Sequence, residues 1–137
     1  MEVIVLKNSD EVCKKASDII GDVVKKNKNA FLGLATGGSA EKVYNYLFED
    51  YNKGILDFSG CSSINLDEYV GLSPDHVQSY RRYMDDRFFN KVNINKENTY
   101  VPITTGDIDS ELLKIRKLIE EKGGTDIQLL GVGSNGH

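Results

Sequence analysis

The stretch AFLGLATGGSAEKVYNYLFEDYNKG, residues 30–54, sets the pattern from which the rest of the fold follows. Its first seven residues form an apolar run of strand length, and two glycines then turn the chain. The residues after the glycines have the spacing of an amphipathic helix that ends at Gly54. The stretch therefore predicts a buried strand that leads through a tight turn into a helix.

The same alternation extends in both directions. Upstream, VIVL (3–6) has the composition of a short strand, and 8–26 has apolar residues at helical spacing behind an Asn8 or Ser9 cap. Downstream we expect strands and helices in turn, at 61–70 (strand), 79–89 (helix), 98–102 (strand), 109–124 (helix) and 126–132 (strand). Because parallel neighbours need helical crossovers, this order predicts an α/β fold with a doubly wound, mainly parallel, Rossmann-like sheet and helices on both faces.

The length of 137 residues suits one compact domain, so we expect residues 1–137 to form a single α/β domain. The strand expected at 126–132 is apolar on both faces, like an internal strand that later elements cover. We therefore expect the domain to break off after this fifth strand, which would make the chain an N-terminal fragment of a longer domain.

Composition excludes several classes of function. The 21 acidic and 17 basic residues are spread without blocks, so no basic surface is expected for nucleic acid or an anionic membrane. The two cysteines, Cys13 and Cys61, lack CxxC spacing, and we expect them to be reduced structural thiols. Together with the two histidines, His76 and His137, they do not form a standard set of zinc ligands, so no metal is expected. No leader-like start and no apolar run near the ~18 residues of a membrane span occur, which indicates a cytoplasmic protein.

Three of the expected strands end at Thr36, Asp67 and Gly133, and the carboxyl ends of parallel strands meet at one edge of the sheet. At the first of them, Thr36, Gly37, Gly38 and Ser39 lead into a helix N-terminus. Consecutive glycines let the backbone approach an anion, and the free N–H groups attract it, so this loop is a candidate phosphate site. An ordinary turn with Ser39 as the N-cap explains the same residues.

The second strand exit carries adjacent carboxylates, Asp67 and Glu68. A carboxylate at such an exit acts as a general base when it reaches a substrate C–H or O–H group. A solvated loop pair is the ordinary explanation of an Asp-Glu dipeptide. In the following segment His76 is expected on the surface, and Tyr69, Tyr80 and Tyr83 are expected to pack and hydrogen-bond rather than catalyse.

The third exit is GVGSNGH, residues 131–137, where Asn135 supplies an amide and His137 an imidazole that exchanges protons near neutral pH. A histidine at this position also fits a disordered end or the start of a purification tag.

Four stretches, taken together, resemble the glucosamine-6-phosphate deaminase family in order and spacing: LGLATGGS (32–39), NLDEYVGLSPDHVQSY (65–80), FFNKVNI with ENTYVP (88–102) and DIQLLGVGSNGH (126–137). The resemblance covers the whole chain and about the N-terminal half of the family's fold. It implies conversion of glucosamine 6-phosphate and water to fructose 6-phosphate and ammonia. It implies no metal and no organic cofactor.

By motif position, the resemblance implies that Asp67 is the base that moves a proton from C2 to C1 of the sugar. His137 would assist ring opening beside Asn135, and Thr36 to Ser39 would hold the 6-phosphate. The chain departs from the family where Ala40 replaces the usual proline, and where Asn135 replaces an aspartate of some relatives.

Other functions remain open at this stage. A galactosamine-6-phosphate deaminase differs only by the epimer, and an inactive sugar-phosphate-binding module would keep the first loop. A 6-phosphogluconolactonase-like hydrolase is less compatible, because its counterpart of LDEYVGL resembles DERxVP and lacks the SPDHVQSY continuation. The expected partners are a small sugar phosphate and either a second copy of the chain or the missing C-terminal part.

Overall fold

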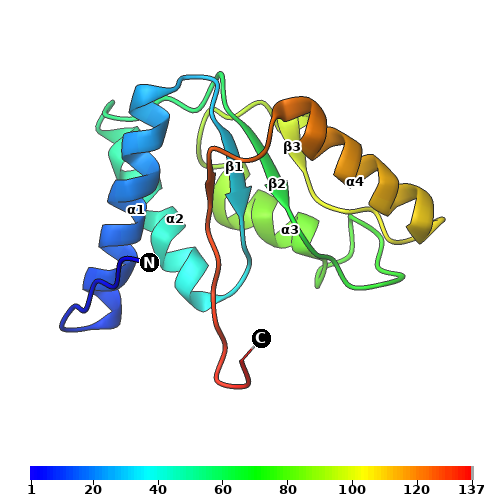
Figure 1. The fold of residues 1–137 in the computed structure, drawn as a ribbon, viewed down its shortest axis with the longest axis horizontal. Helices are drawn as coiled ribbons and strands as arrows, with labels where there is room; N and C mark the ends of the chain where they lie inside the picture. The colour runs from blue at the N-terminus through cyan, green and yellow to red at the C-terminus, as the bar shows by residue number, and fades with distance from the viewer. Residues whose placement is uncertain (137) are drawn as a thin grey trace.

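A parallel sheet forms the centre of the molecule in the computed structural model, which describes residues 1–136 (Figure 1). Its four strands within those residues are β1 (Phe31–Leu34), β2 (Ser62–Asn65), β3 (Thr99–Tyr100) and β4 (Ile127–Gln128). The order is β3-β2-β1-β4, and every neighbouring pair is parallel. All strands therefore end at the same edge, which confirms that the three predicted loops share that edge.

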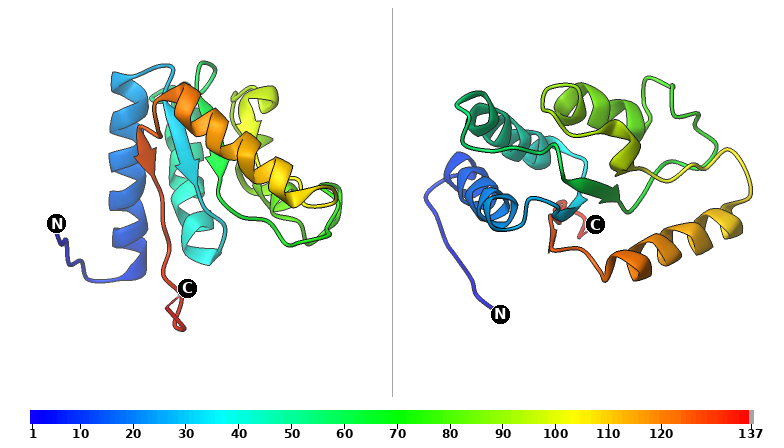
Figure 2. Two further views of the ribbon diagram at one scale, coloured as in Figure 1. Left: turned by 45° about the vertical axis from the view of Figure 1, so that its right-hand side comes forward. Right: turned by 90° about the horizontal axis from the view of Figure 1, so that it is seen from above.

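Helices cover both faces of the sheet, so the predicted doubly wound α/β architecture is confirmed. The helical segments are α1 (Ser9–Lys26), α2 (Gly38–Asn52), α3 (Tyr80–Met84) with a π-helical turn (Asp85–Phe89), a 3-10 turn (Lys96–Asn98) and α4 (Ile108–Lys122). The two views of Figure 2 place α4 on the side of the sheet opposite to α2 and α3. Within residues 1–136, no helix combines the length and apolarity needed to cross a lipid bilayer.

Local sequence signals fix several helix ends. The Asn8 side chain accepts a hydrogen bond from the Glu11 N–H at 2.9 Å and is the N-cap of α1, which selects Asn8 over Ser9. Asp107 caps α4 in the same way, by accepting from the Asp109 N–H at 3.2 Å. The last helix ends at Gly123, whose left-handed conformation (φ 77°) favours glycine.

The main core lies between the sheet and the layer formed by α1, α2 and α3. Leu32 and Leu34 of β1 face this layer, where Tyr44, Phe58 and Phe88 are fully buried. The Tyr44 and Phe88 rings stack with centroids 4.9 Å apart, and Phe58 meets Phe88 edge to face at 5.4 Å. Cys13 and Cys61 are buried free thiols in this core, as predicted.

The prediction of a strand at residues 3–6 is wrong. These residues precede α1 without regular secondary structure, and Val3 and Val5 are 70% and 87% exposed. A four-residue apolar run forms a strand only when a neighbouring strand accepts its hydrogen bonds. No strand within the described part of the chain pairs with it.

The strand predicted at 126–132 is shorter than expected, at Ile127–Gln128. Backbone hydrogen bonds of Asp126 to Phe31 and Leu129 to Gly33 (both 2.9 Å) flank it. The Gln128 side chain crosses Gly33 so closely that a Cβ there would lie 1.8 Å from its Oε1 atom. β4 ends at Gln128, and residues 129–136 form no strand.

The apolar side of α4 is only partly covered. No residue of α4 is buried, and Leu112 and Leu113 are 56% and 67% exposed. At its end, the Lys122 ammonium lies 5.9 Å from the Phe31 ring centroid of β1.

Candidate active site

The first loop connects β1 to α2 and exposes the start of that helix. Gly37 is the N-cap with φ 113° and ψ 163°, a conformation that side-chain-bearing residues rarely adopt. The alternative in which Ser39 is the N-cap is therefore wrong, because Ser39 lies one residue inside the helix. Within the described chain, no protein group accepts from the N–H groups of Gly38, Ser39 and Ala40. The exposed helix start therefore offers unpaired donors of the kind that bind a phosphate.

Side chains from two helices hold this loop in place. The buried Tyr44 hydroxyl donates to the Ala35 carbonyl and accepts from the Ala35 N–H at 3.0 Å, just before Thr36. Burial raises the pKa of Tyr44 above its ordinary value, which keeps the donor protonated. From α3, the Tyr83 hydroxyl donates to the Gly37 carbonyl at 2.9 Å. The loop between β1 and α2 is thus anchored at Ala35 and at Gly37.

The second loop, after β2, separates the two adjacent carboxylates. Asp67 is exposed, and its carboxylate has no hydrogen-bond partner among residues 1–136. Glu68 is half-buried, and its carboxylate accepts from the N–H groups of Tyr69, Tyr80 and Arg81. The solvated-pair interpretation is wrong for Glu68. Asp67 is left as the carboxylate that a substrate can reach.

Tyr80 connects the two loops. Its hydroxyl lies close enough to the side chains of Tyr69 and Thr36, and to the Asp67 carboxylate, for all three to influence its pKa. The hydrogen bond with Tyr69 and then burial raise the pKa of Tyr80 to about 12, so that it stays protonated. The prediction that Tyr69, Tyr80 and Tyr83 pack and hydrogen-bond is confirmed, since the Tyr69 and Tyr80 rings also lie 4.9 Å apart. The structure therefore brings Thr36, Gly37 and Asp67 to one place.

The third loop follows β4 and ends the described residues. Asn135 is exposed in a turn in which the Gly136 N–H donates to the Gly133 carbonyl at 3.0 Å. His137 lies outside the described residues. The surface position of His76 is confirmed, because it is exposed and its Nδ1 atom accepts from the Gln78 N–H at 3.1 Å.

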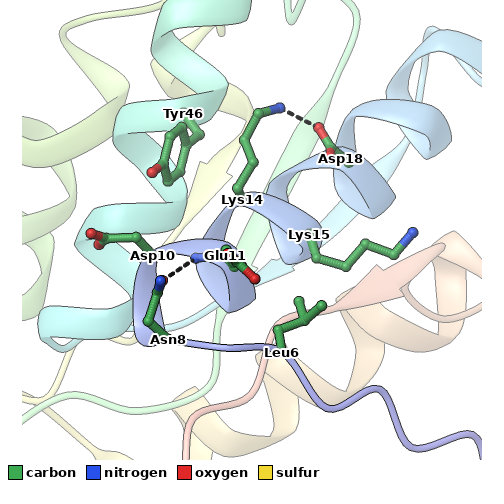
Figure 3. Close-up of a pocket in the computed structure, with 8 residues that line it drawn as sticks. All are labelled: Leu6, Asn8, Asp10, Glu11, Lys14, Lys15, Asp18 and Tyr46. Carbon is green, nitrogen blue, oxygen red and sulfur yellow. Dashed lines mark hydrogen bonds and ion pairs between the residues drawn. The ribbon is translucent and has the colours of Figure 1, made fainter.

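A separate hollow lies between the first half of α1 and Tyr46 of α2 (Figure 3). Charges of both signs line it, and Lys14 forms an ion pair with Asp18. None of the predicted site residues lines it, so its mixed and paired charges do not define a phosphate site. Residues 1–136 also contain no group of three or more His, Cys, Asp or Glu side chains placed to hold a metal ion.

Sequence reasoning missed Tyr44 and Glu68 as supports of the site. The partners of Glu68 on α3 lie 12 and 13 residues further along the chain, and no local pattern marks such a contact. Tyr44 occupies an apolar position of its helix, where a core role accounts for it fully.

Comparison with known proteins identifies relatives of this chain. A glucosamine-6-phosphate deaminase of Clostridium perfringens (strain 13 / Type A) is 48% identical over 138 residues, which cover 100% of this chain and 57% of the relative. A deaminase of the same name from Thermoanaerobacter sp. (strain X514) is 46% identical, with 54% of its length covered. The chain thus spans about half the length of these relatives.

Two solved structures also resemble this chain. A monomeric glucosamine-6-phosphate deaminase matches with a TM-score of 0.95 and 38% identity, over 100% of this chain and 57% of that one. A 6-phosphogluconolactonase from Thermotoga maritima (TM-score 0.76, 22% identity, 98% and 61% covered) shares the fold. Residues 7–137 match the family model described as glucosamine-6-phosphate isomerases/6-phosphogluconolactonase. The chain therefore belongs to the family of glucosamine-6-phosphate isomerases and 6-phosphogluconolactonases.

Proposed function

We propose that the protein carrying this chain converts glucosamine 6-phosphate and water to fructose 6-phosphate and ammonia, and that Asp67 is its base. The observation that carries the proposal is the exposed Asp67 carboxylate beside an anion-binding helix start, with Tyr80 in contact with both loops. The deaminase names of relatives at 46% and 48% identity support the choice of substrate.

The first loop binds the 6-phosphate in this proposal. The N–H groups of Gly38, Ser39 and Ala40 point from the start of α2, where the helix dipole favours negative charge. The hydroxyls of Thr36 and Ser39 add donors. A phosphate held here leaves the sugar ring to extend toward Asp67, which removes the proton at C2 and returns it to C1.

The third loop completes the chemistry in this proposal. His137 moves a proton between the O1 and O5 atoms during ring opening, and Asn135 orients it. Because the Asn135 side chain is neutral, the proposed pair carries no carboxylate charge.

We place the protein in the cytoplasm, where sugar phosphates are produced and consumed. Its partners are the sugar phosphate and a further part of the polypeptide or a second copy. The exposed apolar side chains of Leu130 and Val132 (71% and 84% exposed) support such a covering partner.

The test is the substitution Asp67→Asn in the full-length protein, with Asp75→Asn as a matched control in the same loop. Asp67→Asn should lower kcat for ammonia release by roughly 10² to 10⁴, the range for loss of a general base, while KM changes little. Asp75 is exposed, and its variant should keep wild-type kinetics. Turnover of Asp67→Asn within a few-fold of wild type would disprove the assignment.

A further inference from the structure

Glu68 joins the loop after β2 to the beginning of α3. Its Oε1 and Oε2 atoms accept from the Tyr80 N–H at 3.0 and 2.8 Å, and Oε2 also accepts from the Arg81 N–H at 3.1 Å. The Tyr69 N–H adds a further bond to Oε1 at 2.9 Å. Three backbone donors thus occupy both oxygens, so Glu68 is not available as a base.

A second set of contacts holds the same loop from the other side. The Thr104 hydroxyl donates to the Tyr69 carbonyl at 2.6 Å, and the Gly71 N–H donates to the Thr104 carbonyl at 3.1 Å. The segment that follows Asp67 is therefore fixed to α3 through Glu68 and to the chain after β3 through Thr104. Asp67 itself, which precedes this segment, stays exposed, and its carboxylate has no hydrogen-bond partner within residues 1–136.

We infer that Glu68 is a positioning residue that fixes the direction of the Asp67 carboxylate. The inference rests on the proposed function, in which Asp67 removes the C2 proton. The two residues are adjacent, so the backbone held by the Glu68 side chain is also the backbone that sets where the Asp67 side chain points. General-base catalysis requires the base within hydrogen-bond reach of the proton, and a shift of about 1 Å lowers the rate by on the order of 10².

The experiment is Glu68→Gln in the full-length protein, measured by ammonia release from glucosamine 6-phosphate. The glutamine side chain keeps the shape but presents an NH₂ group to a backbone donor, so at least one bond is lost. We expect kcat to fall by on the order of 10², with KM within about two-fold of wild type, because the phosphate loop is untouched.

The double variant Asp67→Asn/Glu68→Gln separates positioning from general damage. If Glu68 acts through Asp67, the double variant has the kcat of Asp67→Asn alone to within about two-fold, since the base is already gone. An additive loss would overturn the inference. Thr104→Val, which removes the second contact with Tyr69, should give a smaller loss of kcat that also disappears in the Asp67→Asn background.

Asp57→Asn is the matched control. Its Oδ1 atom accepts from the Ser59 N–H at 2.9 Å and the Asn93 amide at 2.8 Å, at the opposite end of β2. This variant should leave kcat unchanged even where it lowers the melting temperature. If Glu68→Gln keeps the wild-type kcat while Asp67→Asn is inactive, the positioning role of Glu68 is overturned and the role of Asp67 as base stands. An active Asp67→Asn would overturn the proposed function and the role of Glu68 with it.

Discussion

Removal of the Tyr44 hydroxyl should loosen the loop between β1 and α2, the proposed phosphate site, at a measurable cost in stability. In Tyr44→Phe the ring keeps its place against Phe88, so no cavity forms. What is lost is the pair of hydrogen bonds that the hydroxyl makes with the Ala35 N–H and carbonyl groups. These bonds hold the residue that immediately precedes Thr36.

The magnitude follows from the two bonds. A typical intramolecular hydrogen bond contributes about 0.5–1.5 kcal/mol net, so the loss of two lowers the free energy of unfolding by about 1–3 kcal/mol. Ala35 is half-buried, so water reaches its freed groups only in part, which favours the upper half of this range. Affinity for inorganic phosphate should fall as well, because the loop loses its anchor before Gly37.

Urea unfolding followed by circular dichroism measures the change, with Tyr46→Phe as the control on the same helix. Tyr46 is half-buried, and its hydroxyl makes no hydrogen bond within residues 1–136, so its removal should change the free energy of unfolding by less than about 0.5 kcal/mol. Equal stabilities of the two variants would refute the reasoning. Unchanged phosphate affinity in a destabilised Tyr44→Phe would refute the link between this anchor and the site.

Two further predictions concern the same loop and its anchor. A Cβ at Gly38 would meet no atom within 4 Å, so Gly38→Val should leave the melting temperature nearly unchanged. This variant should nevertheless weaken binding of a 6-phosphate sugar by about tenfold or more, which corresponds to the loss of one hydrogen bond to a charged group. Calorimetry measures this affinity, and an unaltered value would favour a plain turn. Burial raises the pKa of Tyr44 in the folded state above its ordinary value of 10.0. As the pH rises past about 10, Tyr44 therefore loses its proton in the unfolded state first, and the free energy of unfolding falls. Urea titrations from pH 8 to 11 should show this alkaline loss in the wild type and a smaller one in Tyr44→Phe, and identical slopes would contradict it.

The sequence by itself determined the order of elements from α1 onward and the edge of the sheet at which the candidate loops lie. Apolar periodicity and cap chemistry act within one or two turns of chain, so Asn8, the glycines after β1 and the end of α2 near Gly54 were predictable locally. The rule that parallel strands end at one edge then placed Thr36 and Asp67 together. The roles of Asn135 and His137 stay predictions.

Only the tertiary structure decided which polar groups meet. Glu68 and Asp67 are alike in sequence, yet α3 brings its backbone donors to Glu68 and leaves Asp67 exposed. Residues 3–6 have strand composition but gain no structure without a neighbouring strand. The physical reason is the same in both cases: a hydrogen bond needs its partner at about 2.9 Å, and the packing of helices on the sheet, not the local pattern, sets which partner arrives.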